Sequence, residues 1–68
     1  MTLEQIQAIL RGAETTLKLV LASPDYQRYE QSVYFTTSND LTLGDAVQAL
    51  IEVQSAIAQV EDCNQCNN

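Results

Sequence analysis

The sequence predicts a mainly α-helical fold, an antiparallel two-helix hairpin formed by about residues 2–22 and 43–62. Two observations lead to this prediction. Apolar side chains recur at alternating spacings of three and four residues in both segments, which is the period of one face of an α-helix. A capping motif stands at the start of each segment. Because the chain has 68 residues, we expect one helical domain over residues 1–62 and a polar C-terminal tail over residues 63–68.

The first helix is predicted from its cap and its apolar face. Thr2 and Gln5 form a capping-box pattern, in which the hydroxyl and the side-chain amide each satisfy a backbone N–H of the first turn. Glu14 and Lys18 add an ion pair at the favourable i,i+4 spacing. The apolar face consists of Leu3, Ile6, Leu10, Ala13, Leu17 and Val20.

The connection between the two long helices is predicted to hold two short elements. Ser23 followed by Pro24 is typical of an N-cap and a first helical position, which favours a short helix over 24–31. Residues 33–37 are rich in β-branched and aromatic side chains and favour an extended segment. Residues 38–40 predict a turn into the second long helix. If the extended segment pairs as a strand, the alternative is a small α+β fold of order αββα.

The second long helix is predicted to have an apolar face wider than one neighbouring helix covers. Thr42 and Asp45 occupy capping positions, and the main stripe is Leu43, Ala46, Leu50, Val53, Ile57 and Val60. A second apolar row widens this face: Val47, Ile51 and Ala58. A small domain often gains stability from a partner subunit, so we expect a homodimer that forms a helical bundle. The predicted dimer or core face consists of Val47, Leu50, Ile51, Ile57 and Ala58.

Charge and composition exclude several classes of partner. The formal net charge is −6, which disfavours direct contact with nucleic acid and with anionic membranes. The longest apolar run, residues 19–22, is far shorter than the roughly 20 residues that span a bilayer, and the first residues lack the pattern of a signal peptide. We therefore expect a cytoplasmic chain whose partner is another protein.

The sequence does not predict an enzyme. It contains no histidine, so a serine or cysteine nucleophile would lack its usual base. Its two glycines, Gly12 and Gly44, cannot form a glycine-rich phosphate loop. We expect no cofactor.

The Cys-x-x-Cys motif at Cys63 and Cys66 is the one short motif with a chemical meaning. A redox role is disfavoured, because the negative end of a helix and the neighbouring Glu61 and Asp62 oppose formation of a thiolate. A zinc site needs four ligands, which only two copies of the chain would supply. We expect the motif to belong to a polar tail without a metal, and a metal-linked dimer is the alternative.

The aromatic residues suggest a binding surface. All four, Tyr26, Tyr29, Tyr34 and Phe35, lie within ten residues of one another, together with Arg28. Tyrosine and arginine dominate protein-binding hot spots. We predict that Tyr26, Arg28 and Tyr29 form a partner-binding surface, and that Tyr34 and Phe35 pack into the core at the end of the hairpin where the connection lies.

Three functions are compatible with these features. The first is a small acidic, non-enzymatic protein-interaction module, an adaptor or regulator that self-associates. The second is an acidic inhibitor, of the kind that mobile elements encode, which blocks a basic surface on a nucleic-acid-handling protein. The third is the metal-linked dimer. The second function would use acidic residues that meet no basic residue on their own helix: Asp45, Glu52, Glu61 and Asp62.

Overall fold

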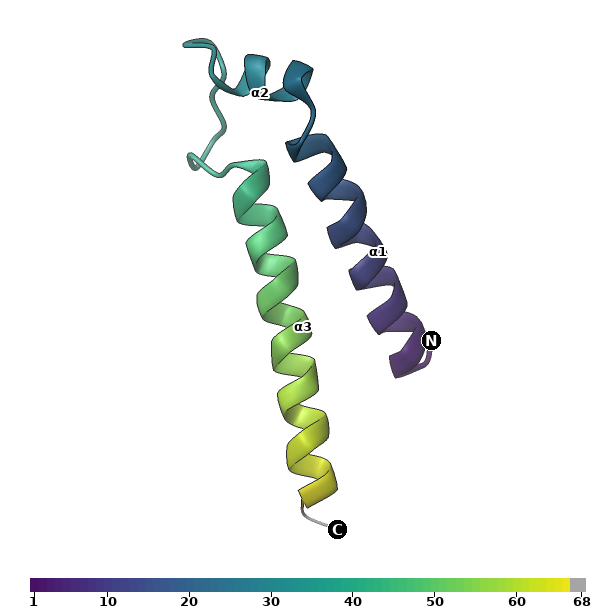
Figure 1. Cartoon of the computed structure of the whole chain (residues 1–68). Helices are drawn as coiled ribbons and strands as arrows, with labels where there is room; N and C mark the ends of the chain where they lie inside the picture. Colours follow the sequence, from purple (N-terminus) through teal and green to yellow (C-terminus); the bar gives the residue numbers. More distant parts are fainter. Residues whose placement is uncertain (67–68) are drawn as a thin grey trace.

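The computed structural model describes residues 1–66, the last three by their backbone alone, and it confirms the mainly helical prediction. Helix α1 spans Leu3–Leu21, α2 spans Pro24–Glu30 and α3 spans Leu43–Cys66. Helices α1 and α3 pack side by side in opposite directions, and α2 lies at the closed end of this hairpin (Figure 1). Within residues 1–66, each helix is too short or too polar to span a membrane.

Both predicted helix caps are present. The Gln5 N–H donates to Thr2 Oγ1 at 3.2 Å, and the Thr2 N–H donates to Gln5 Oε1 at 2.8 Å. At the start of α3, the Asp45 N–H donates to Thr42 Oγ1 at 3.2 Å, and the Thr42 N–H donates to the Asp45 carboxylate at 2.8 Å. These reciprocal bonds satisfy backbone N–H groups that a first helical turn leaves without a partner.

The connection after α2 is irregular. Helix α2 begins at Pro24 as predicted, and residues 1–66 contain no β-strand, so the α+β alternative is not supported. Instead of extending, the chain turns, because the Phe35 N–H bonds to the Ser32 carbonyl at 3.0 Å. The predicted turn before α3 is present. Asp40 adopts a φ of 57° there, a left-handed conformation that aspartate tolerates better than most residues.

The hairpin interface on α3 is rotated from its predicted position. Predicted and observed stripes share Leu43, Leu50 and Ile57, which are half-buried. The other positions differ: Val47, Gln54 and Glu61 face α1, whereas the sequence predicted Ala46, Val53 and Val60. On α1, the half-buried residue at the end of the stripe is Leu21 rather than Val20.

This rotation has a polar cause. Gln54 and Glu61 form hydrogen bonds with side chains of α1. A stripe centred on Val53 and Val60 would not bring these groups together.

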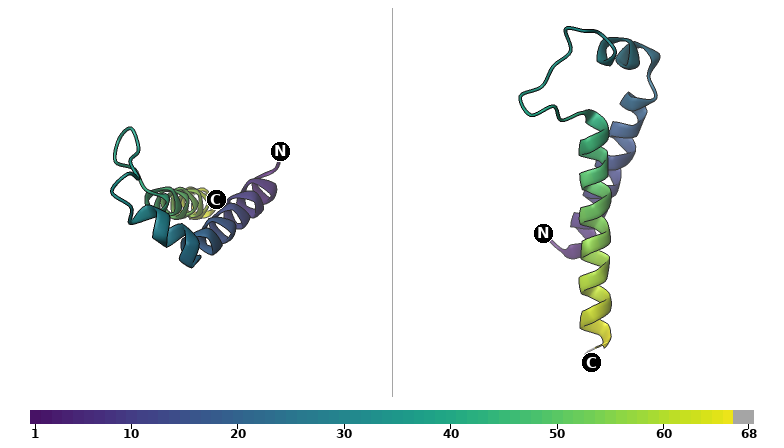
Figure 2. Two further views of the ribbon diagram at one scale, coloured as in Figure 1. Left: turned by 90° about the horizontal axis from the view of Figure 1, so that it is seen from above. Right: turned by 90° about the vertical axis from the view of Figure 1, so that its left-hand side faces the viewer.

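The hairpin is elongated and has little interior. Its extents are 54 × 21 × 18 Å and its radius of gyration is 15.9 Å, whereas a compact chain of this length has a radius of about 11 Å. Figure 2 shows α1 inclined to α3, and the C-terminal turns of α3 extend beyond the start of α1. Helix α3 continues past residue 62, so residues 63–66, assigned to a polar tail by the sequence, are helical.

Candidate interaction surfaces

Tyr26 anchors α2 and is only partly available for binding. Its hydroxyl donates to the Glu30 carboxylate at 2.8 Å, and its ring meets the Phe35 ring edge-on, with centroids 6.3 Å apart. The hydrogen bond to Glu30 raises the pKa of the tyrosine hydroxyl, burial adds to this effect, and the backbone amide of Leu43 opposes it. Tyr26 therefore ties α2 to the connection, which makes its role largely structural.

Arg28 and Tyr29 lie together on the exposed side of α2. They line an open hollow of about 450 Å³ with Asp25 and Ser32. Tyr29 is 71% exposed. Arg28 forms an ion pair with Asp25, one turn earlier on the same helix. The hollow combines an aromatic ring with a locally neutralised cation, which suits contact with a mixed apolar and polar protein surface. Of the predicted binding residues, only Arg28 and Tyr29 form this surface.

The prediction that Tyr34 and Phe35 belong to the core is wrong for Tyr34, which is 90% exposed. Phe35 is partly covered by Tyr26 and remains 38% exposed. The reason is the turn over residues 32–35, which carries Tyr34 and the neighbouring Val33 outward instead of laying them over the hairpin. Val33 and Tyr34 are thus exposed beyond the end of α2.

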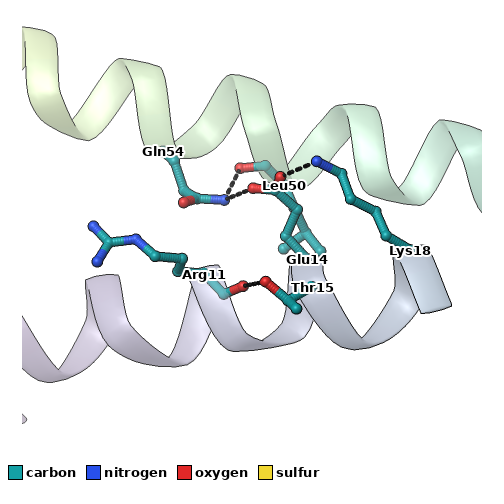
Figure 3. Close-up of polar contacts among 6 residues, drawn as sticks. All are labelled: Arg11, Glu14, Thr15, Lys18, Leu50 and Gln54. Atoms are coloured by element: carbon teal, nitrogen blue, oxygen red, sulfur yellow. Dashed lines mark hydrogen bonds and ion pairs between the residues drawn. The ribbon is translucent and has the colours of Figure 1, made fainter.

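A polar seam lies between the two long helices (Figure 3). Gln54 Nε2 on α3 donates to Glu14 Oε1 on α1 at 2.8 Å, and Lys18 Nζ lies 2.6 Å from Glu14 Oε2. The hydrogen bond from Lys18, followed by the one from Gln54, lowers the pKa of the Glu14 carboxyl. A second contact, from Gln7 Nε2 to Glu61 Oε2 at 3.1 Å, lies nearer the open end of the hairpin.

Gln7 and Gln54 were not predicted from the sequence to be contact residues. A signal was present, since Gln54 and Glu61 continue the spacing of Val47, Leu50 and Ile57 along α3. Polar residues in such a stripe indicate paired contacts across the interface rather than a gap in the apolar face.

The four carboxylates predicted to form an acidic surface do not converge. Asp45 is engaged in the cap of α3, and Glu61 is half-buried and accepts the hydrogen bond from Gln7. Asp62 follows Glu61 and is rotated about 100° from it around the helix axis. Only Asp45 and Glu52, seven residues apart, lie on one side of α3. The acidic-inhibitor function stays a prediction with this reduced surface.

The cysteine motif lies in the last turns of α3. Cys63 is exposed, whereas the side chain of Cys66 lies outside the described part of the chain. Among the residues that the structure describes, no cluster of three or more histidine, cysteine, aspartate or glutamate side chains could hold a metal ion. A zinc site shared between two copies stays a prediction.

Most residues of the predicted dimer or core face are at least half-buried within the hairpin. Val47 is 6% exposed against α1, and Leu50, Ile51 and Ile57 are half-buried, while Ala58 is exposed. The exposed large apolar residues of the long helices are different ones: Leu3, Ile9, Leu19, Val20, Val53 and Val60. This second group is the apolar surface of the long helices that the hairpin leaves exposed.

Comparison of the chain with models of protein families, with curated proteins and with solved structures finds no match. Function is therefore inferred from the surfaces themselves. Three of them stand out: the hollow beside Tyr29, the polar seam around Glu14, and the exposed apolar residues of α1 and α3.

Proposed function

We propose that this protein is a small, acidic, non-enzymatic protein-interaction module, an adaptor or regulator that acts as a self-associated helical unit. One observation carries the proposal. Hydrophobic residues make up 46% of the chain, yet Val47 is the only buried one among the side chains of residues 1–63. Apolar surface left in water forgoes about 25 cal/mol per Å² of stabilisation. Contact with another protein surface recovers part of it.

The surface offered to a different protein is the exposed side of α2. Tyr29 and Arg28 supply the residue types that dominate hot spots, and they border an open hollow at the closed end of the hairpin. Since α2 lies at the end of the molecule rather than along its sides (Figure 1), association along α1 and α3 leaves it accessible. A self-associated unit would present this surface more than once, which raises avidity for a multivalent partner.

The non-enzymatic part of the proposal and the choice of a protein partner rest on composition and chemistry. The sequence lacks histidine, and the acidic residues of α3 are dispersed rather than paired for acid and base roles. A net charge of −6 favours a protein partner over nucleic acid or an anionic membrane.

Sedimentation equilibrium at several micromolar concentrations tests self-association. We expect a mass of at least twice the 7.5 kDa of one chain and a melting temperature that rises with protein concentration. A mass of 7.5 kDa at every concentration, with a concentration-independent melting temperature, would contradict the proposal.

A further inference from the structure

The two flanks of the hairpin differ in charge. Successive residues rotate by about 100° around a helix axis. With Leu10 and Leu17 turned toward α3, every charged residue of α1 falls on one flank: Glu4, Arg11, Glu14 and Lys18. On the opposite flank, α1 places Ile9 and Val20, which are 56% and 40% exposed.

Helix α3 continues this uncharged flank. With Leu50 and Gln54 turned toward α1, Val53 and Val60 lie on the same side of the hairpin as Ile9 and Val20, because the two helices run in opposite directions. Val53 and Val60 are 48% and 59% exposed, and both line one shallow groove with Leu3 from the start of α1. We define the apolar flank as Leu3, Ile9, Val20, Val53 and Val60 with Ala46, Ala49 and Ala56 between them.

The hairpin exposes more surface than a compact protein of its mass, and the excess area is larger than the area that each partner buries in a standard interface. The chain exposes 5534 Å², which is about 1,300 Å² more than the roughly 4,200 Å² expected for a compact chain of this mass. A standard protein–protein interface removes about 800 Å² from each partner. The missing burial is therefore of the size that one further copy of the hairpin supplies.

Charge argues against a basic partner or a nucleic acid on this flank. Such a partner would gain from free carboxylates at the contact, but the residues of the apolar flank carry none, and Glu61, which borders the groove, already accepts a hydrogen bond from Gln7. A second copy with a net charge of −6 is repelled at long range. Meeting at an uncharged flank keeps the like charges of the two copies apart.

Shape supports the same occupant. Along α3 the bulky Val53 and Val60 alternate with Ala49 and Ala56, so in a two-fold contact the large residues of one copy can meet the small residues of the other.

We infer that a second copy of this chain covers the apolar flank, and that two hairpins meet there to form a four-helix bundle. The inference rests on the proposed self-association and adds the surface through which it occurs. The charged flank and the exposed side of α2 then remain in water.

Matched lysine substitutions test the surface. Val53→Lys and Ile9→Lys place a charge on the apolar flank from each long helix, and Ser55→Lys and Ala8→Lys introduce the same residue at exposed positions elsewhere on α3 and α1. Lysine is at least as good a helix former as valine, isoleucine and serine. Sedimentation equilibrium and far-ultraviolet circular dichroism are measured on all four variants and the parent.

We expect the parent and both control variants to be dimers. Val53→Lys and Ile9→Lys should each weaken dimerisation by about 100-fold or more, because an unpaired ammonium would have to be buried at the contact. Loss of helix in both flank variants, with helix retained in both controls, would also support the inference. The isolated hairpin leaves Val53 and Ile9 about half exposed and gives neither lysine a reason to unfold it.

Two results would overturn the inference in distinguishable ways. A parent dimer whose strength is unchanged in Val53→Lys and Ile9→Lys would place the contact on another surface, and self-association itself would stand. A parent that remains a monomer at all concentrations would remove both the flank contact and the proposed self-association.

Discussion

The side-chain amide of Gln54 on α3 donates a hydrogen bond of 2.8 Å to the carboxylate of Glu14 on α1. The same nitrogen donates to the Leu50 carbonyl at 3.1 Å, and Lys18 holds the second oxygen of Glu14 at 2.6 Å. The Glu14 side chain is only 19% exposed, so a rotation of α3 that broke these contacts would leave a partly covered carboxylate without partners. The polar seam thus fixes the rotation that leaves Val53 and Val60 outside the hairpin.

The Glu14 contacts predict a pH-dependent stability difference. Because the pKa of Glu14 lies below its ordinary value of 4.5 in the folded protein, its contribution is present above the unfolded pKa and disappears as the pH falls through the folded pKa. Glu14→Gln should therefore melt slightly below the parent at pH 7, and the difference should close below about pH 4.5. Melting curves by circular dichroism at fixed protein concentration measure it.

The control for this prediction is Glu52→Gln, which removes one negative charge from an exposed position of α3. Because pH also changes the stability of the parent, the informative quantity is the difference between each variant and the parent at the same pH. A Glu14→Gln deficit that persists unchanged to pH 3 would show that the carboxylate charge is not what stabilises the seam.

Val47 should contribute more to stability than the exposed Val33 of the connection. It is 6% exposed, and Val47→Ala removes two methyl groups from the hairpin interface at about 0.8 kcal/mol each, plus a small cavity term. We expect a loss of about 2 kcal/mol in urea denaturation at fixed protein concentration. Val33→Ala, at a position 87% exposed in the connection, should change stability by less than about 0.5 kcal/mol. Equal losses at the two positions would mean that Val47 is not the centre of the interface.

The long helices and their caps were predictable from the sequence because their signals are local. A capping box or an apolar period operates within a few residues, and Thr2 with Gln5, or Thr42 with Asp45, forms its contacts without help from distant segments. The short helix at Pro24 was predictable for the same reason. Its neighbour, the segment 33–37, was not, since β-propensity gives a strand only when another strand pairs with it.

The rotation of α3 about its axis could not be predicted from local sequence signals. Two stripes on this helix share Leu50 and Ile57, and the apolar count favours the one with Val53 over the one with Gln54. The choice between them depends on Glu14, forty positions away in the sequence, which provides an acceptor for the Gln54 amide. Val47, predicted as part of a combined dimer or core face, is buried within the hairpin itself.

The cap of α3 provides a test of how much a single local contact stabilises the fold. Thr42→Ala removes the acceptor for the Asp45 N–H, and loss of an N-cap hydroxyl typically costs about 1 kcal/mol. Thr42→Ser keeps the hydroxyl and should lie within about 0.5 kcal/mol of the parent. Urea denaturation at one protein concentration distinguishes them. If the alanine and serine variants are equally destabilised, the methyl group rather than the hydrogen bond matters.

The cysteines separate two modes of association. If the apolar flank carries the dimer, replacing Cys63 and Cys66 together with serine should leave the mass, the melting temperature and the helix content unchanged. If two chains share a zinc site, the same change should release about one metal ion per dimer and weaken association, because metal binding then contributes to assembly. Sedimentation with metal analysis of protein purified without chelator measures both quantities.

Tyr29 and Tyr26 should respond differently to truncation, although they lie one turn apart on α2. Tyr29 is 71% exposed, so Tyr29→Ala should leave helix content and melting temperature nearly unchanged. Tyr26→Ala removes the contact with the Phe35 ring and the hydrogen bond to Glu30, and it should lower the melting temperature. Circular dichroism of the two variants and of Tyr29→Phe, which retains the ring, measures these effects.

The same variants locate the binding surface. A partner is first isolated by its binding to the parent protein, and its affinity for each variant is then measured by calorimetry. We expect Tyr29→Ala to lose more than about 1 kcal/mol of binding free energy, the usual threshold for an important interface residue. Tyr29→Phe should lose less, since it keeps the aromatic surface beside Arg28. An unfolded Tyr29→Ala protein would assign the ring to the structural core. A folded variant with undiminished affinity would move the partner away from the hollow on α2 and toward the long helices.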